Sequence, residues 1–429
     1  MGSSLRIAVA GLGTVGTGVV QVLLDRRDDF FRRVARDLVI IGVSARDRQK
    51  RRLPSLAAIA WFDDPLSLVK SEADVIVELI GGEDGTALEL VRLALMAGKH
   101  VVTANKALLS RHGAELAEIA EQNGVALKFE AAAAGGIPIV KALRESLVAH
   151  GVGAIRGILN GTCNYILTQM ESTGRSFHDV LADAQRMGFA EADPALDIGG
   201  GDTAHKLALL AGIAFGIRPT LAHTTVRGIA DVTPDDIVFA REFGCRIKLL
   251  GVARLGPEGI DQRVHPAMVK RSSPLGDVEG AFNAVVADAG EAGPFFFAGR
   301  GAGQAPTAAA VIADLLDVAR GDVGPAFGRP ATQLEESRPA PESARAAAFY
   351  LRFRAVDQPG VLAEIAGNLA HANVSIESMI QRGRASDETV TIVMITHECP
   401  PAALESALKA IAASDRVLTT PTMIPMETA

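Results

Sequence analysis

The first 130 residues alternate short apolar runs with stretches of helical periodicity, and this alternation restricts the fold more than any other feature of the chain. The apolar runs lie at 5–10, 38–43, 73–80, 100–104 and 125–130. Stretches such as GTGVVQVLLDRR and TALELVRLALMAG separate them. Buried strands that alternate with helices form a parallel, doubly wound sheet, so we predict an α/β fold for this part of the chain.

The hexapeptide GLGTVG follows the first of these strands and opens a helix. In the pattern G-x-G-x-x-G, Gly11 permits a tight turn, Gly13 lets the backbone approach a pyrophosphate, and Gly16 allows close packing of helix on strand. The helix N-terminus then favours the anion. We therefore predict a Rossmann-type dinucleotide site that includes Thr14 and Val15. A plain strand–helix turn is the alternative interpretation.

The residues after the second and fourth strands bear on the choice of cofactor and on the substrate. Where an NAD enzyme usually offers an acid to the ribose diol, the chain reads SARDR, so Arg46 suggests room for a 2′-phosphate and favours NADP. Asp47 leaves NAD open. VTANKALL places Thr103 and Lys106 at the carboxyl end of the sheet, where such folds bind ligands. Lys106 can orient or polarise a substrate carbonyl there, although the spacing alone is equally consistent with a solvated lysine at a helix start.

The stretch GFAEADPALDIGGGDTAHKL places four carboxylates ahead of a helix that has the apolar content of a buried one: Glu191, Asp193, Asp197 and Asp202. Asp202 and Lys206 are four residues apart on that helix and therefore share a face. Buried carboxylates need partners, so we expect mutual pairing or a cationic ligand, such as a small substrate with an ammonium group. The lysine could then pass a proton to a carbonyl oxygen. An acidic loop that caps the helix would account for only one or two of these residues.

Composition and cysteine usage exclude several classes of protein. A formal net charge of −7 without a basic cluster argues against nucleic acid as the main partner. No apolar run approaches the roughly 20 residues of a membrane span, and the chain enters a strand pattern at once, so we expect no membrane partner and no signal peptide. Three distant cysteines fit a reducing cytoplasm. Cys163 could be an attacking thiol, but no histidine stands close in sequence, so a small filler at a helix start is favoured.

The rest of the chain divides into three segments. Helices are predicted at 138–148, 162–172, 176–187 and 202–215, followed by strands of an open mixed sheet at 246–255, 262–269, 282–289 and 294–299 and a helix at 303–320. A stretch rich in Gly, Pro and charge is typical of a linker. The final pattern is β-α-β-β-α-β, the ferredoxin-like order. The predicted domains are 1–135 with 302–322, then 136–301, a linker at 323–347, and 348–429.

Taken together, these motifs resemble homoserine dehydrogenase from the amino to the carboxyl end, in the monofunctional long form that ends in an ACT domain. The matching motifs are GLGTVG, VVTANKALL, FEAAAAGGIPIVKAL, ILNGTCNYILTQM, GFAEADPALDIGGGDTAHKL and GRGAGQAPTAAAV. The resemblance implies a reversible, NAD(P)-dependent reduction of L-aspartate 4-semialdehyde to L-homoserine, on the route to threonine, methionine and isoleucine.

The resemblance also implies roles for individual residues. Lys206 would donate a proton to the aldehyde oxygen, Asp202 would orient that lysine, and Lys106 would lie near both nicotinamide and substrate. Hydride would pass directly between the nicotinamide and the carbonyl carbon, so the protein would supply orientation and donors for the developing alkoxide. The implied substrate-binding residues are Glu191, Asp197, Gly161 and Thr162, and Gly303 would touch the nucleotide.

A cation site and an effector site follow from the same resemblance. The family's monovalent-cation loop would bind Na⁺ through backbone oxygens of Glu130, Ala133, Gly135 and Ile137. The stretch DQPGVLAEIAGNLAHANVSI is similar to the ACT signature, in which paired modules bind an amino acid at their interface. We expect L-threonine as an inhibitor there, with a module used only for dimer contact as the alternative. The effector residues would be Asp357, Gly360, Val361, Leu362, Asn373 and Ile376.

Two other functions compete with this interpretation. An acylating semialdehyde dehydrogenase would use Cys163 and require phosphate, whereas a non-catalytic sensor would bind only NADP and an amino acid. The set Lys106, Asp202 and Lys206 disfavours the sensor. We expect a homodimer through the open sheet of the middle domain, or a homotetramer through the tail.

Overall fold

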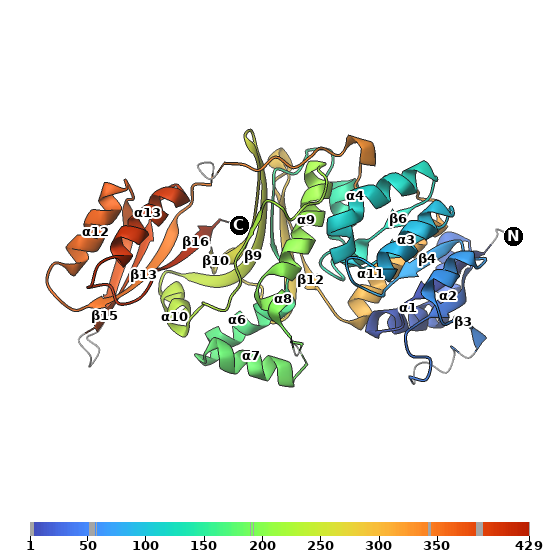
Figure 1. Ribbon diagram of the computed structural model, residues 1–429, viewed down its shortest axis with the longest axis horizontal. Helices are drawn as coiled ribbons and strands as arrows, with labels where there is room; N and C mark the ends of the chain where they lie inside the picture. The colour runs from blue at the N-terminus through green and yellow to red at the C-terminus, as the bar shows by residue number, and fades with distance from the viewer. Residues whose placement is uncertain are drawn as a thin grey trace.

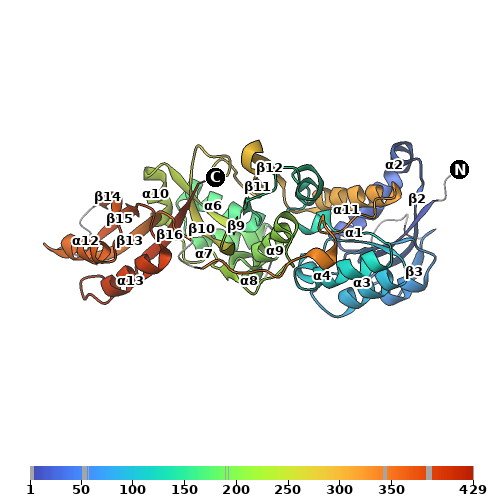
Figure 2. The same cartoon turned by 90° about the horizontal axis from the view of Figure 1, so that it is seen from above.

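The computed structural model describes residues 4–50, 56, 58–188, 190–191, 193–341, 345–382 and 389–428. Three units lie in a row along its longest axis (Figures 1 and 2). A parallel sheet flanked by helices forms the N-terminal unit, a mixed sheet covered by helices forms the central unit, and a smaller α/β layer forms the C-terminal unit. The predicted α/β class with a ferredoxin-like tail is confirmed.

The N-terminal unit is a six-stranded parallel sheet of order β3-β2-β1-β4-β5-β6. This order confirms the predicted doubly wound arrangement. The short third strand, with only the three residues AWF, was not predicted. The strands are β1 (Leu5–Ala10), β2 (Leu38–Ser44), β3 (Ala60–Phe62), β4 (Val75–Glu78), β5 (His100–Thr103) and β6 (Leu127–Lys128).

Helices cover both faces of this sheet, and one of them comes from late in the chain. Helix α11 (Gln304–Ala319) packs against α1, and Val19 and Val311 lie in the same buried core. A Cβ at Gly18 would lie 2.6 Å from the side chain of Gln304, so the two helices approach closely at a glycine. The other helices are α1 (Thr14–Asp25), α2 (Arg27–Val34), the short η2 (Pro65–Lys70), α3 (Thr86–Met96) and α4 (Lys106–Gln122).

The central unit is built on the antiparallel pair β9 (Cys245–Gly256) and β10 (Gly259–Lys270). Helix α9 (Gly201–Phe215) packs on β9 where Gly251 lies opposite Thr203 and Leu207. The predicted helix at 138–148 is instead a short α5 (Ile139–Lys141) continued by the π-helical η4 (Ala142–Ser146). The remaining elements are β7 (Ala154–Ile158), α6 (Gly161–Thr173), α7 (Phe177–Arg186), α8 (Ala195–Ile198), β8 (Thr224–Val226), α10 (Pro234–Glu242), β11 (Phe282–Asp288) and β12 (Pro294–Arg300).

The C-terminal unit has the strand order β16-β13-β15-β14, which is the ferredoxin-like order predicted from the sequence. Its last strand also pairs in parallel with β10, through Met268 with Met426 and Val269 with Glu427. A single ten-stranded sheet therefore runs through the central and C-terminal units. The elements are β13 (Phe349–Val356), α12 (Val361–His371), β14 (Ile376–Arg382), β15 (Thr389–Thr396), α13 (Pro401–Ala412) and β16 (Thr422–Glu427).

Ionic contacts reinforce this junction. Asp236 of α10 is buried and accepts hydrogen bonds from the Arg352 Nε, at 2.6 Å, and from the Tyr350 hydroxyl, at 3.1 Å. Glu427 near the carboxyl end is also buried and pairs with Arg254 of β9. These contacts fix the C-terminal unit against the central one.

The segment 323–347 crosses from the N-terminal to the C-terminal unit along the top of the view in Figure 1; residues 342–344 lie outside the described part. It contains the short η6 (Ala331–Gln333), and its Phe327 is buried against Phe129, with ring centroids 5.2 Å apart. Ala326, Ala331, Leu334 and Ala340 are buried as well, so the segment contacts the rest of the molecule at several points along its length.

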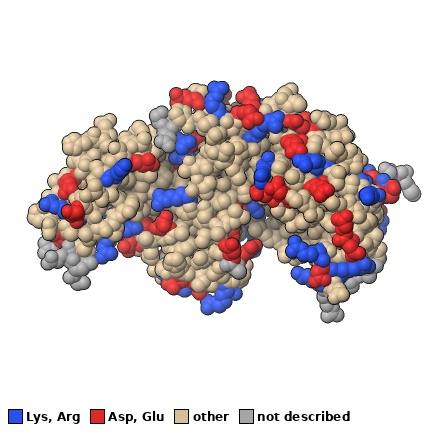
Figure 3. Space-filling view, viewed as in Figure 1, with Lys and Arg blue, Asp and Glu red and all other residues tan. Residues whose placement is uncertain are grey.

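Acidic and basic side chains are interspersed over the face shown in Figure 3. Within the described ranges, no helix combines the length and the apolar character that crossing a membrane requires.

Candidate active site

The candidate site forms where β7 ends against the first turn of α9. Leu159 and Asn160 follow β7 directly, and the Asn160 Oδ1 accepts the Cys163 N–H at 2.8 Å, which caps α6. Gly200 takes φ +89° at the start of α9, a left-handed conformation that favours glycine. The run of glycines thus starts α9 immediately after α8, with Asp202 in its first turn.

Three charged side chains meet at this point. The Lys206 Nζ lies 2.7 Å from the Asp202 Oδ2, and the Lys106 Nζ lies 3.1 Å from the Asp202 Oδ1. The side chains of Asp202 and Lys206 are 7% and 11% exposed, whereas that of Lys106 is 32% exposed. Lys106 starts α4 of the N-terminal unit, so the cluster joins the two units at the carboxyl end of the parallel sheet. The predicted i, i+4 pair is present, and Asp202 also binds the second predicted lysine.

The electrostatics of Asp202 follow from these contacts. Burial favours the neutral acid, but Lys206 and Lys106, together with hydrogen bonds from Lys206 and Asn160, outweigh burial and hold the pKa of Asp202 well below its usual range. Asp202 is therefore ionised at neutral pH. A buried carboxylate that bridges two ammonium groups fixes both of them in place.

Asn160 was not among the predicted site residues, yet it bridges two of them. Its Nδ2 donates to the Asp202 Oδ2 and to the Asp197 Oδ1, each at 2.8 Å. The sequence signal that could have identified it is the motif NGTC, because an asparagine before a helix start is a typical N-cap. Asp197 itself lies in α8, half-buried.

The remaining predicted substrate residues lie around this cluster at different depths. Gly161 opens α6, and a Cβ there would lie 2.8 Å from the Ala281 carbonyl oxygen, so the position requires glycine. Thr162 is half-buried in the same turn. Glu191 is exposed, and its backbone carbonyl accepts a hydrogen bond from the Gln185 Nε2 at 3.1 Å. Asp193 is exposed just before α8 and accepts the Ala195 N–H at 3.1 Å.

Cys163 is fully buried beneath the cluster. Burial, together with the nearby charges of Asp197 and Asp202, raises the pKa of the Cys163 thiol well above its usual value. The thiol donates to the Asp197 carbonyl oxygen at 3.2 Å. A thiol that stays protonated is a poor nucleophile, so the geometry supports the interpretation of Cys163 as a packing residue.

The glycine loop has the geometry that a bound dinucleotide requires. Gly11 has φ +102°, and a Cβ there would lie 2.4 Å from the Leu79 carbonyl oxygen. A Cβ at Gly16 would lie 1.9 Å from the Gly11 carbonyl oxygen, which shows how closely α1 packs on the turn. Around Gly13 the space is open, and Thr14 is exposed at the helix start, with Val15 half-buried behind it. These residues fit a pyrophosphate at the N-terminus of α1.

Further predicted cofactor residues lie at the ends of neighbouring strands. Arg46 is exposed, two residues after β2. Thr103 at the end of β5 is buried, and its hydroxyl donates to the Glu78 Oε2 at 2.5 Å. Gly303 has φ +115° at the start of α11, the helix that returns to pack on α1. All three lie in the N-terminal unit or on the helix packed against it.

The predicted cation loop is a buried turn next to α5. The Glu130 carboxylate accepts the backbone N–H groups of Val140, at 2.9 Å, and Lys141, at 2.8 Å, so it supports the loop structure. Gly135 has φ +56°, and a Cβ there would lie 2.2 Å from the Gly301 carbonyl oxygen. Ala133 and Ile137 are buried in the same turn. In the described part of the chain, no group of three His, Cys, Asp or Glu side chains could hold a metal ion, so a cation here would depend on backbone oxygens.

The predicted effector residues lie at the two ends of α12. Asp357, Gly360, Val361 and Leu362 precede or open the helix, and Gly360 takes φ +93°. Asn373 and Ile376 follow its other end, where Asn373 takes φ +57°. An 11-residue helix is about 16 Å long, so the two groups are separated by about that distance within one chain.

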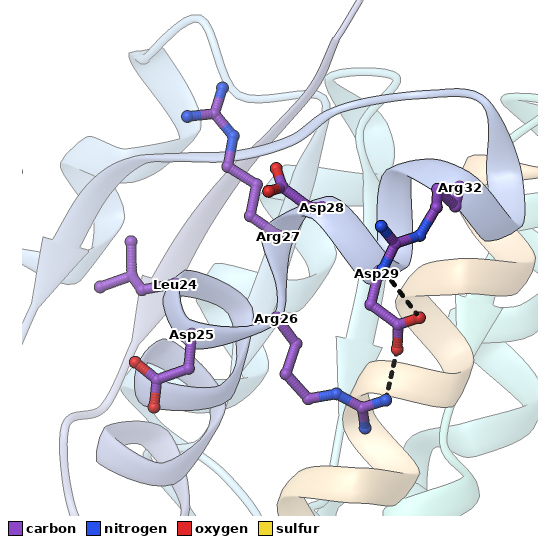
Figure 4. A pocket seen from close by; sticks show the side chains of 7 residues that line it. All are labelled: Leu24, Asp25, Arg26, Arg27, Asp28, Asp29 and Arg32. Carbon is purple, nitrogen blue, oxygen red and sulfur yellow. Dashed lines mark hydrogen bonds and ion pairs between the residues drawn. The ribbon is translucent and has the colours of Figure 1, made fainter.

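A separate surface hollow lies where α1 meets α2 (Figure 4), lined by Leu24, Asp25, Arg26, Arg27, Asp28, Asp29 and Arg32. Asp29 contacts both Arg26 and Arg32, so these charges neutralise one another. The hollow is at the carboxyl end of α1, about 18 Å of helix away from the glycine loop. It does not belong to the candidate site.

Comparisons with known proteins agree with this geometry. Family models match residues 11–130 (homoserine dehydrogenase, NAD binding domain), 138–316 (homoserine dehydrogenase) and 349–415 (ACT domain). The homoserine dehydrogenase of Neisseria gonorrhoeae is 43% identical over 430 residues, which cover 99% of this chain and 98% of that protein. That of Pseudomonas aeruginosa is 40% identical over 420 residues, with 96% of each chain covered.

The crystal structure of a homoserine dehydrogenase from Thiobacillus denitrificans superposes with a TM-score of 0.93 and 42% identity, and covers 100% of this chain and 99% of the other. The similarity therefore extends over the nucleotide-binding, catalytic and ACT units together. The chain belongs to the homoserine dehydrogenase family of oxidoreductases.

Proposed function

We propose that this chain catalyses the reversible reduction of L-aspartate 4-semialdehyde to L-homoserine at the cluster of Lys106, Asp202 and Lys206. The observation that supports this most strongly is the bridging of both lysines by one buried carboxylate. Two oriented ammonium groups at the carboxyl end of a dinucleotide-binding sheet are suited to an aldehyde that becomes an alkoxide.

Lys206 is the proposed proton donor. An ammonium group has three N–H bonds, and two of them are directed to the Asp202 Oδ2 and the Leu159 carbonyl oxygen, each at 2.7 Å. The direction of the third is thereby fixed, and we assign it to the substrate oxygen. When a nicotinamide is bound it supplies the hydride. Lys106, which is more exposed, would stabilise the same developing negative charge from the nucleotide side.

The carboxylates nearby suit the amino-acid end of the substrate. Asp197 is half-buried, and its carboxylate accepts a hydrogen bond from the neutral Asn160 amide, so it can also receive the substrate ammonium. Glu191 is exposed and precedes Asp197 by six residues in the chain. We therefore retain Asp197, Glu191, Gly161 and Thr162 as the proposed substrate residues.

For the cofactor we propose NADP over NAD. The Asp47 Oδ1 accepts the N–H groups of Gln49, at 2.8 Å, and Lys50, at 3.1 Å. The Asp47 carboxylate therefore stabilises the turn in which it lies. Arg46 and Arg48 are exposed beside it. A 2′-phosphate would meet positive charge at this edge.

We also propose that backbone oxygens of Glu130, Ala133, Gly135 and Ile137 bind Na⁺. The loop is buried and irregular, and buried carbonyl groups need partners. A bound cation would stabilise the turn that connects the nucleotide-binding and catalytic parts.

For the ACT domain we propose binding of L-threonine between two copies of the chain. Because Asp357 and Asn373 lie at opposite ends of α12, a small amino acid cannot contact both within one chain. Two modules related by a two-fold axis would bring one group from each copy together. This proposal includes a homodimer or homotetramer, and an inhibitory effect on the enzyme.

The domain organisation is likewise proposed as 1–135 with 302–322 for the nucleotide, 136–301 for the substrate, and 348–429 for regulation. Packing of α11 on α1 supports the inclusion of the late segment in the first domain. A cytoplasmic location is part of the proposal, because the three cysteines are unpaired.

The direct test measures consumption of NADPH and NADH by the purified chain with L-aspartate 4-semialdehyde. The chain should consume NADPH in preference to NADH, and Lys206→Met should lower kcat by about 100-fold or more, as expected for loss of a positioned acid. Lys409→Met, which removes an exposed lysine from α13, is the matched control and should leave kcat unchanged. No turnover by the unsubstituted chain would refute the proposed reaction.

A further inference from the structure

We propose that Asn160 is a positioning residue that holds Asp197 and Asp202 at a fixed separation and thereby orients the Lys206 ammonium group. The inference rests on the proposed reaction and adds to it a residue that does not itself touch the reacting atoms.

Every hydrogen-bonding group of the Asn160 side chain is used. Its two amide hydrogens go to the Asp197 Oδ1 and the Asp202 Oδ2, each at 2.8 Å, and its oxygen accepts the Cys163 N–H at 2.8 Å. Asn160 is 5% exposed. The side chain therefore joins three elements, because Asp197 belongs to α8, Asp202 to α9 and Cys163 to α6.

An amide is the appropriate group for this position. One oxygen of Asp197 and one oxygen of Asp202 lie within hydrogen-bond distance of the same nitrogen, the Asn160 Nδ2. Two carboxylates therefore lie close together in a poorly solvated part of the molecule. Such a pair is favoured by neighbouring hydrogen-bond donors. The neutral Asn160 amide supplies one N–H donor to each carboxylate without adding charge.

The geometry transmits this restraint to Lys206. The same Asp202 oxygen, Oδ2, accepts from both the Asn160 Nδ2 and the Lys206 Nζ. The neighbouring Leu159 carbonyl accepts from Lys206 as well, and from the Asn283 Nδ2 at 2.9 Å. The dipeptide at 159–160 thus restrains the ammonium group directly through its carbonyl and indirectly through Asp202.

The consequence for the reaction concerns distance. If Asp197 receives the substrate ammonium and Lys206 contacts the carbonyl oxygen, Asn160 sets the spacing between the two ends of the binding site. Loss of that restraint should reduce kcat more than it raises KM, because misplacement by about 1 Å can cost about 100-fold in rate.

Two substitutions separate this role from helix capping. Asn160→Ser and Asn160→Asp both keep an oxygen that can accept the Cys163 N–H, since Ser and Asp are good N-caps. Neither retains two donors. The exposed Asn123, whose Nδ2 donates to the Ile119 carbonyl oxygen at 2.8 Å, gives a matched control in Asn123→Asp.

The experiment measures kcat, KM and their pH dependence, NADPH binding by fluorescence, and thermal unfolding for the full chain. Both substitutions at Asn160 should lower kcat by about 100-fold and leave NADPH affinity within threefold of that of the unsubstituted chain. The control Asn123→Asp should be as active as the unsubstituted chain. The rate of Asn160→Asp relative to the unsubstituted chain should rise as the pH falls, because the introduced carboxyl group regains one donor when protonated.

If the unsubstituted chain turns over, any one of three outcomes overturns the inference. The first is a kcat of Asn160→Ser within threefold of that of the unsubstituted chain, and the second is a loss of kcat in Asn160→Asp that is the same at every pH. The third is a loss of NADPH binding that parallels the loss of kcat. If Asn160→Asp does not fold, Asn160→Ser decides the question by its kcat. Absence of turnover by the unsubstituted chain would instead refute the proposed reaction.

Discussion

The substitution Asp202→Asn isolates the contribution of the buried carboxylate, because it changes the charge and hardly changes the volume. In the structure that carboxylate accepts from Lys206, Lys106 and Asn160. An amide offers one oxygen and one nitrogen in its place, so at least one of the three donors would face another donor. Two ammonium groups would also stand close together without their counter-ion.

The expected loss of stability follows from burial. Removal of one partner from a buried ion pair costs about 3–5 kcal/mol. Because the Lys106 side chain is 32% exposed and can turn toward water, we expect the lower end of this range, about 3 kcal/mol. The rate should fall by about 100-fold or more, because Lys206 loses the carboxylate that orients its ammonium group.

The effect on stability has a defined pH dependence. Since the pKa of Asp202 in the folded chain lies below its usual value, the carboxylate stabilises the fold at neutral pH, and this contribution is lost progressively as the pH falls below about 5. The difference in unfolding free energy between the original chain and Asp202→Asn should therefore be constant from neutral pH down to about 5 and shrink at lower pH.

Urea unfolding across this pH range, together with steady-state kinetics, provides the assay. Asp183→Asn is the control, because Asp183 pairs with Arg175 and Arg186 on the exposed surface and should contribute little. An Asp202→Asn protein with unchanged stability at neutral pH, or with a difference in unfolding free energy that grows in acid, would refute this reasoning.

Three further predictions concern other parts of the molecule. Gly16→Ala should weaken NADPH binding by at least about 10-fold in a fluorescence titration, because its Cβ would lie 1.9 Å from the Gly11 carbonyl oxygen; unchanged affinity would contradict the assigned loop. Cys163→Ala should keep kcat within about threefold, since a thiol with a raised pKa is not the nucleophile; loss of turnover would favour the thioester alternative. Asp236→Asn should lower the free energy of unfolding by about 3 kcal/mol in urea, because the buried Arg352 contact is broken; a protein of normal stability would show that this contact does not hold the ACT domain in place.

Features that depend on local sequence could be predicted well. Strand β1 was predicted at 5–10 and is found at Leu5–Ala10, because an apolar run before a glycine motif is a local signal. The Asp202–Lys206 contact follows from helical spacing alone. The family resemblance implied only that Lys106 lies near nicotinamide and substrate, and the contact of Lys106 with the Asp202 carboxylate came from the structure.

Features that depend on long-range pairing could not be predicted. Asn160 contacts carboxylates 37 and 42 positions later in the chain, and a helix-capping pattern does not indicate such contacts. Strand β16 pairs with β10 through only two residue pairs, so no pattern in either strand indicated one sheet across two domains.

This pairing also means that deletion of the C-terminal unit would expose β10. Point substitutions such as Asp357→Asn are therefore the better test of control by threonine.

The most direct test of the central claim is a crystal structure of the chain with L-homoserine and NADP⁺ bound. We predict that the homoserine hydroxyl oxygen lies within hydrogen-bond distance of the Lys206 Nζ and that the substrate ammonium group contacts Asp197. A ligand bound away from the segment 188–207, or a hydroxyl oxygen whose hydrogen-bond partners exclude Lys206, would contradict the account.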